Sequence, residues 1–141
     1  MGKSIFTLLF MFLLNFNYKA SSAYTFYDQN KEWQQSKARG KEIYTDFCIQ
    51  CHLANGKGTP GVVPPLDNSN WLKDKRKESI HAVKYGQSGP ILVNGVRYNG
   101  TMTAMGLTDE EVADVMNYIM NSWSNKQKTP VTPEEVRSIK K

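Results

Sequence analysis

The clearest hydrophobic pattern lies near the end of the chain. Residues 112–123 carry apolar side chains at i, i+3, i+4, i+7, i+8 and i+11, the spacing of an amphipathic helix with one buried face. These side chains are Val112, Val115, Met116, Ile119, Met120 and Trp123. Thr108 and Glu111 precede them at the spacing of a capping box, in which each side chain binds the other residue's backbone N–H. The pattern predicts a core helix with Thr108 as its N-cap.

Two further stretches have helical spacing. Between Ser36 and Phe47, the positions of Ile43, Phe47, Gly40 and Tyr44 give one apolar stripe. Gly40 weakens this helix by about 1 kcal/mol relative to alanine, so a close approach of another helix is expected there.

A third helix is predicted within residues 71–85. Ile80 and Val83 lie at helical spacing, and Gly86 is placed just past its C-terminal end. His81 lies on this helix and is interpreted as a surface or partly buried histidine rather than as a ligand.

Glycine and proline separate these helices. Residues 53–61 contain three glycines and a proline and predict a turn-rich loop. Residues 62–66 are apolar, but Pro64 and Pro65 lack the N–H groups of a strand or helix interior, so this segment is expected to lie extended along an apolar cofactor. Residues 87–100 are predicted to form a loop with a brief hairpin around Asn94-Gly95. The predicted fold class is therefore all-α.

The N-terminus has the pattern of a secretory signal. Lys3 is followed by a 12-residue run, residues 5–16, that is almost wholly apolar, and Ser21-Ser22-Ala23 offers small residues for cleavage before Tyr24. The run is too short to span a bilayer comfortably, although an uncleaved membrane anchor is the alternative. We expect residues 1–23 to be a signal peptide and the mature protein to be extracytoplasmic, in the periplasm.

The charge of the chain bears on its possible binding partners. The chain has 141 residues and a net charge of +5. Loss of Lys3 and Lys19 with the signal leaves 16 basic and 13 acidic residues, a net charge of +3, which does not favour nucleic-acid binding. A basic cluster is formed by Lys73, Lys75, Arg76 and Lys77. It is either a solvated helix face or a docking patch for an acidic redox partner.

Residues 48–52 carry the strongest chemical signal. They read Cys-Ile-Gln-Cys-His, the attachment signature of a c-type haem. The thiols of Cys48 and Cys51 add across two vinyl groups of one porphyrin, and His52 then falls under the iron as its proximal ligand. A ligating histidine donates its other N–H to a nearby acceptor, and the Pro64 carbonyl is the candidate here, with Pro65 as the alternative.

Other uses of a C-x-x-C pair fit this sequence less well. A zinc site needs two more ligands, and the 29-residue gap between His52 and His81 does not match zinc-finger spacing. A thioredoxin-like pair belongs in a βαβ context, and no such alternation occurs. A structural disulfide is the default in an exported chain, but the histidine that follows Cys51 favours haem attachment.

A second iron ligand is expected from the segment before the last helix. Met102 and Met105 both lie there, and a methionine thioether paired with histidine raises the potential of haem iron. Either methionine alone could equally be a core residue.

The ordered set of motifs resembles the class I monohaem cytochromes c. The set comprises the helix with Gly40 and Tyr44, the haem motif, the glycine-rich loop with Pro64-Pro65-Leu66, the methionine loop and the last helix. The resemblance implies that the first and last helices cross, with Gly40 and Tyr44 meeting Val115 and Tyr118.

The runs 98–102 and 107–112 are similar to cytochrome domains that serve oxidases, alcohol dehydrogenases and copper nitrite reductases. In that comparison Met102 falls on the ligand and Met105 on an aromatic position, while Thr103 replaces the usual proline. The resemblance thus implies Met102 as the ligand.

Together these features predict a domain order and a function. Residues 1–23 are the signal peptide, 24–35 an N-terminal lead, 36–124 a small cytochrome c fold of three to five helices around one covalent haem c, and 125–141 a loosely attached tail. The predicted function is that of an electron carrier and not an enzyme, with iron bound by His52 and Met102. Its expected partners are redox proteins of unspecified identity, a membrane-bound oxidase or reductase among them, and it is expected to be a monomer.

Two other functions stay open at this point. If neither methionine reaches the iron, the chain would be a haem enzyme or a gas-binding sensor with an open distal site. If no haem is attached, Cys48 and Cys51 would make it a thiol redox protein, with both thiols open to alkylation.

Overall fold

The computed structural model describes residues 28–141. The predicted signal peptide and residues 24–27 of the predicted lead lie outside the described residues. The described part of the chain divides into two units, residues 28–34 and 35–141. Residues 28–34 of the first unit are helical. Within residues 28–141, no helix combines the length and the apolar character that crossing a membrane requires.

The second unit begins with the helix that the sequence predicted. Residues 35–43 are α-helical, and the chain then passes through a π-helical turn, η1 (Tyr44–Cys48), into the short helix α2 (Ile49–His52). The Cys-x-x-Cys-His motif is therefore part of the helix. Leu53 ends α2 with a positive φ of 63°.

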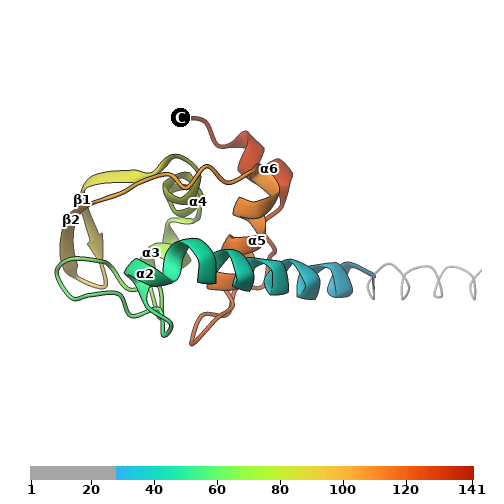
Figure 1. Ribbon diagram of the computed structural model, residues 1–141, viewed down its shortest axis with the longest axis horizontal. Helices are drawn as coiled ribbons and strands as arrows, with labels where there is room; N and C mark the ends of the chain where they lie inside the picture. Colours follow the sequence, from blue (N-terminus) through green and yellow to red (C-terminus); the bar gives the residue numbers. More distant parts are fainter. Residues whose placement is uncertain (1–27) are drawn as a thin grey trace, which may run out of the picture. The chain divides into compact units, whose positions relative to one another are not determined.

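Four more helices follow within the second unit. They are α3 (Asn70–Asp74), α4 (Arg76–Tyr85), α5 (Asp109–Ile119) and α6 (Pro133–Ser138) (Figure 1). The capping box of α5 is confirmed: the Thr108 hydroxyl accepts from the Glu111 N–H, and the Thr108 N–H donates to Glu111 Oε2 at 2.8 Å. Gly86 ends α4 as predicted, with a φ of 88°.

An antiparallel hairpin adds one small sheet to the predicted all-α fold. Strands β1 (Gln87–Val93) and β2 (Val96–Met102) pair from Val93↔Val96 out to Gln87↔Met102. The predicted turn at Asn94-Gly95 is confirmed, and both residues have positive φ, as a two-residue hairpin turn requires. The strands are longer than expected because one hairpin face is packed inward: Val93 and Tyr98 are both buried. The fold is thus helical with one small sheet.

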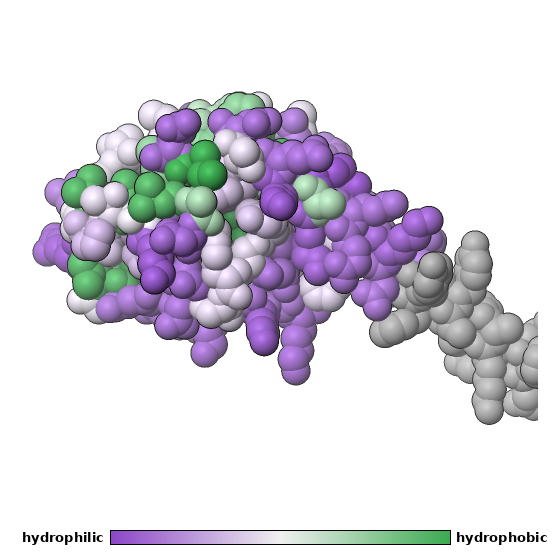
Figure 2. Space-filling model, turned by 60° about the horizontal axis from the view of Figure 1, so that its bottom comes forward, coloured by the Kyte–Doolittle hydropathy of each residue, from purple (hydrophilic) through white to green (hydrophobic). Residues whose placement is uncertain are grey.

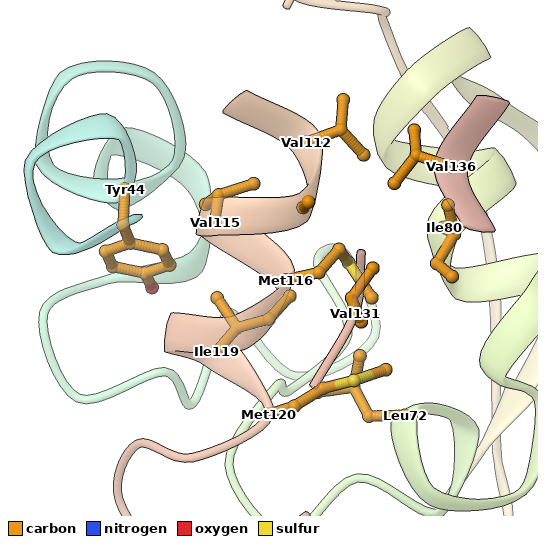
Figure 3. Packing of buried hydrophobic residues seen from close by; sticks show 11 residues of the cluster. Tyr44, Leu72, Ile80, Val112, Val115, Met116, Ile119, Met120, Val131 and Val136 are labelled. Atoms are coloured by element: carbon orange, nitrogen blue, oxygen red, sulfur yellow. The ribbon is translucent and has the colours of Figure 1, made fainter. Parts of the chain in front are cut away.

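The core of the second unit is built around α5. Figure 3 shows α5 with Tyr44 on one side and Ile80 and Val136 on the other. The helix crossing expected at Gly40 is present, since a Cβ there would lie 2.0 Å from the Asp114 carbonyl oxygen and 2.9 Å from Tyr118 Cβ. The rings of Tyr44 and Tyr118 lie 5.4 Å apart.

The C-terminal segment was expected to be loosely attached, and this expectation is wrong. Val131 and Val136 are buried in the same core as α5. The Arg76 guanidinium binds both carboxylate oxygens of Glu135, at 2.7 and 2.8 Å, and the Asn117 side chain pairs with the backbone N–H and C=O of Val131. Arg76 is therefore committed to internal contacts and is not a free member of a docking patch.

Candidate cofactor site

The predicted site residues converge on one cavity of about 220 Å³. Its wall includes Cys48, Cys51, His52, Pro64, Met102 and Met105. The remaining wall is mainly apolar and comes from the loop after His52, from α3, α4 and α5, and from the hairpin. Those residues include Val62, Val63, Pro65, Leu66, Trp71, Leu72, Ala82, Val83, Ile91, Val93, Tyr98, Val115 and Ile119. All five residues of the segment 62–66 line the cavity.

The two cysteines differ in their surroundings. Cys48 ends η1 and is half-buried, whereas Cys51 lies on α2 and is exposed; both thiols are free. Burial raises the pKa of the Cys48 thiol to about 11, and the neighbouring Cys51 adds to the rise. Cys48 is therefore held as a neutral thiol at neutral pH.

His52 is buried at the end of α2, with 7% of its surface exposed. Its Nδ1 lies 3.2 Å from the carbonyl oxygen of Pro64, the acceptor that the sequence suggested. Burial lowers the pKa of His52, so the ring is neutral at neutral pH. With Nδ1–H donating to a carbonyl, the lone pair of Nε2 is left for a metal ion.

The loop after His52 is folded so that the Pro64 carbonyl reaches the ring. The Gly58 N–H donates to the His52 carbonyl at 3.1 Å, and Gly56 accepts from the N–H groups of Leu66 and Asp67. Gly58 has a φ of +59°, and a Cβ there would lie 2.4 Å from Val63 O and 2.7 Å from Pro64 O. Only glycine fits this position without moving the Pro64 carbonyl.

Aromatic side chains brace the start of the same loop. The Tyr44 hydroxyl donates to the Leu53 carbonyl at 2.7 Å, and Trp123 Nε1 donates to the Ala54 carbonyl at 3.1 Å. The rings of Tyr44 and Trp123 lie 5.5 Å apart. Burial raises the pKa of Tyr44 strongly, so its phenol stays a hydrogen-bond donor.

Both methionines line the cavity and both are half-buried. Met102 is the last residue of β2 and pairs with Gln87 in the ladder. Its carbonyl oxygen also lies against Gly86, where a Cβ would come within 2.8 Å. Met105 lies in the irregular segment that follows. The backbone of Met102 is thus the more firmly held of the two.

His81 is placed elsewhere, in agreement with its interpretation as a non-ligand. It lies on α4, and its ring packs 5.2 Å from that of Tyr85. In the described part of the chain, no group of three His, Cys, Asp or Glu side chains is arranged to hold a metal ion.

Sequence reasoning did not single out two of the large wall residues, Trp71 and Tyr98. Tyr98 could have been found from the alternation of the hairpin, because it lies opposite Ile91 on the inward face. Trp71 is the second residue of α3, a helix of only five residues, which is too short to show a hydrophobic period.

The mouth of the cavity is apolar. Phe47 and Val62 line the cavity, yet they are 46% and 65% exposed. Figure 2 shows apolar side chains gathered among polar ones on the surface. Leu53, Leu92 and Val96 are the other large apolar side chains that are exposed in the described residues.

The residues present fit a covalently bound haem. Two thiols lie on one helical stretch, a neutral imidazole has one nitrogen already hydrogen-bonded, and a thioether lies in the same apolar cavity. Such a set suits haem, because its iron accepts imidazole and thioether ligands and its macrocycle favours an apolar pocket.

Comparison with known proteins agrees with this chemistry. The cytochrome c family matches residues 37–123. The chain is 38% identical to cytochrome c-552 of Thermus thermophilus over 114 residues, which cover 74% of this chain and 76% of that protein.

Two longer proteins are also similar over part of their length. The gluconate 2-dehydrogenase cytochrome c subunit of Pantoea cypripedii is 35% identical over 72% of this chain and 24% of its own length. The cbb3-type cytochrome c oxidase subunit CcoP of Rubrivivax gelatinosus is 31% identical over 62% of this chain and 26% of its own length. The family implies a covalent haem c and electron transfer, and Cys48 and Cys51 fit its attachment motif. With more than half of its length matched, the chain belongs to the cytochrome c family.

Proposed function

We propose that this protein is an extracytoplasmic electron carrier with one haem c. The haem is bound through thioethers to Cys48 and Cys51, and its iron is bound by His52 and Met102. The observation that carries the proposal is the convergence of these four side chains on one apolar cavity. When bound, the haem supplies a one-electron couple, with iron cycling between the ferrous and ferric states.

The chain's own residues have separate tasks in this proposal. Cys48 and Cys51 fix the macrocycle, which no other side chain of the cavity could do covalently. His52 binds iron through Nε2 while Nδ1–H donates to Pro64, which fixes the ring orientation and raises its basicity. The apolar wall excludes water, which favours the less charged, reduced state and so raises the potential.

Met102 is proposed as the second ligand in preference to Met105. The ladder pair with Gln87 and the contact with Gly86 hold its backbone in place. A ligand on a strand end is positioned more reproducibly than one in an irregular loop. Met105 is then proposed as a wall residue that keeps water from the iron.

If His52 and Met102 both bound the haem iron, no position would be left for a substrate, so the protein is proposed to be a carrier and not an enzyme. A haem enzyme or gas-binding sensor is the competing function. It would require both thioethers to stay off the iron, and the placement of both methionines in the cavity wall speaks for ligation instead.

Redox proteins are the proposed partners. Several relatives are cytochrome subunits of a dehydrogenase or an oxidase, so a membrane-bound complex of this kind is proposed as donor or acceptor. The exposed apolar side chains of Phe47 and Val62 at the cavity mouth give such a partner a water-poor surface next to the cofactor. The periplasm is the proposed location, with residues 1–23 as the export signal.

The proposal is tested by optical spectra of the haem-loaded protein, produced in an exporting host that attaches haem. Ferric and ferrous spectra are recorded for the wild type, Met102→Ala and Met105→Ala. We expect a low-spin ferric wild type with a methionine–iron charge-transfer band that is lost only in Met102→Ala.

The other outcomes are equally informative. Loss of the band only in Met105→Ala would leave the carrier function in place and make Met105 the ligand instead of Met102. A high-spin ferric wild type that binds carbon monoxide rapidly after reduction would overturn the carrier function in favour of an open site.

A further inference from the structure

The segment that carries both methionines is joined to the rest of the fold at a narrow neck. We call residues 86–108 the methionine segment; it begins where α4 ends and ends where α5 begins. Lys84 in the last turn of α4 pairs with Asp109 in the first turn of α5, with Nζ and Oδ1 2.7 Å apart. This ion pair, the neck, connects the two ends of the methionine segment.

Helix α6 contacts both sides of the neck. The Val136 carbonyl accepts from Lys84 Nζ at 2.9 Å, and the Ile139 carbonyl accepts from the Tyr85 hydroxyl at 3.2 Å. Arg137 approaches Asp109 at 3.8 Å from the other side. Lys84 is thus held between a carboxylate of α5 and a carbonyl of α6, with only 15% of its side chain exposed.

Helix α6 is itself anchored by contacts outside the neck. Arg76 binds Glu135 through two nitrogens and also donates to the Pro130 carbonyl at 2.9 Å. Asn117 of α5 fixes the backbone of Val131, and the Val136 side chain is fully buried. Helix α6 therefore cannot leave the neck without breaking buried contacts.

Movement at the neck would be transmitted to Met102. Gly86, two residues after Lys84, lies against the Met102 carbonyl and the Ala104 N–H, where a Cβ would come within 2.8 and 3.2 Å. The tip of the hairpin is tethered separately, by reciprocal hydrogen bonds between Asn70 and Asn94. The neck therefore acts together with the ladder pair between Gln87 and Met102 at this end of the hairpin.

We propose that α6 positions the axial methionine: by holding Lys84 against Asp109, it keeps the methionine segment closed over the cofactor cavity. This inference rests on the proposed methionine ligation. It assigns a function to the C-terminal segment, which lies beyond residues 37–123 matched by the family. Lys84 is a positioning residue, since it acts through the segment and does not line the cavity.

The test compares two signals during guanidinium unfolding of the haem-loaded ferric protein. The methionine–iron band reports ligation, and far-ultraviolet circular dichroism reports the helices. In Lys84→Met, which keeps the apolar stem, we expect the band to disappear at a lower denaturant concentration than the helices do. The equilibrium constant for methionine release should rise roughly tenfold, the scale of a coupled ion pair. Lys84→Arg should bring the loss of the band back most of the way to the denaturant concentration of the wild type.

Arg39→Met is the matched control. Arg39 pairs with Asp114 of α5 at 2.6 Å, and that carboxylate is 12% exposed, so the variant also breaks an ion pair on α5, but one that is not part of the neck. Both signals should shift together in this variant. Tyr85→Phe removes only the hydroxyl that binds the Ile139 carbonyl, so it is a milder change than Lys84→Met. We expect the band to be lost at a slightly lower denaturant concentration, with the circular dichroism signal unchanged.

The results separate this inference from the function on which it rests. If the two signals move together in Lys84→Met and Tyr85→Phe as they do in Arg39→Met, α6 is only a stabilising element and the inference is wrong. If the wild type lacks the band altogether, the proposed methionine ligation itself is wrong.

Discussion

On one side of the cavity, Cys48, Cys51 and His52 lie within five consecutive residues of one helical stretch. On the other side, Met102 lies at the end of a hairpin within the methionine segment, whose two ends are joined by an ion pair between α4 and α5. The histidine side is therefore fixed by local helical geometry, and the methionine side by contacts between residues far apart in the chain. We therefore expect that a change on one side of the cavity can weaken His52 or Met102 as a ligand without affecting the other.

The largest expected effect distinguishes the residues that attach the haem covalently from the methionine that binds its iron. In the double variant Cys48→Ser/Cys51→Ser, both thioether bonds are lost, so no haem should remain on the denatured chain. Met102→Ala, on the opposite side, should retain covalent haem at the wild-type level. Haem staining after denaturing electrophoresis distinguishes them, and covalent haem in the double variant would contradict the assignment of the cysteines.

A second prediction perturbs the histidine side without touching a ligand. Gly58→Ala places a Cβ against the Pro64 carbonyl and should displace it from His52 Nδ1. A weaker hydrogen bond makes the imidazole less basic, so the potential should rise on the order of tens of millivolts, where 59 mV is a tenfold change for one electron.

Gly61→Ala is the control for this change. Gly61 also has a positive φ, 74°, but a Cβ there has no neighbour within 4 Å. Through backbone strain, Gly61→Ala should lower the free energy of unfolding about as much as Gly58→Ala does. The reduction potential of the haem should stay unchanged. An equal shift of potential in both variants would mean that strain, and not the Pro64 carbonyl, is responsible.

A smaller effect is expected where the methionine segment meets α5. Thr108→Ala removes the side chain that caps α5, which should lower the free energy of unfolding by about 1 kcal/mol. Denaturant unfolding followed by circular dichroism measures this loss. Because the cap lies beside the neck, the methionine–iron band should weaken before the helices unfold, unlike in Gly61→Ala.

The smallest effect is a dependence on pH. Hydrogen bonds from the Thr108 N–H and hydroxyl hold the pKa of Glu111 below its usual value of 4.5. The carboxylate therefore contributes stability that is present above pH 4.5 and is lost as the pH falls through the lowered pKa. Glu111→Gln should be less stable than the wild type above pH 4.5, and the two should converge in more acidic solution. A difference in the free energy of unfolding between the two proteins that stays the same at every pH would contradict this role of Glu111.

Local patterns predicted what is local in this fold. The capping box of α5 and the turn at Asn94-Gly95 depend on a few neighbouring residues, and each was found where the sequence placed it. The crossing at Gly40 was expected from a resemblance, and the contact with Tyr118 confirms it. The convergence of Cys48 and His52 on one cavity likewise follows from their spacing on a helix.

What the sequence did not predict depends on pairs that are distant in the chain. Arg76 was grouped with three lysines as a basic cluster, yet it binds Glu135, 59 residues away, and so anchors α6. The burial of Val136 follows from that anchor and from the contact of Lys84 with its carbonyl. A basic residue on a short helix has the same local pattern whether it meets water or a distant carboxylate.

The most direct test of the account is an equilibrium redox titration of the haem-loaded wild type beside Met102→His. We expect one reversible one-electron transition in each protein, with the potential of Met102→His lower by on the order of 0.1 V, since methionine opposite histidine raises the potential of haem iron. A potential unchanged by Met102→His, or a wild type that does not exchange one electron reversibly, would contradict a carrier ligated by His52 and Met102.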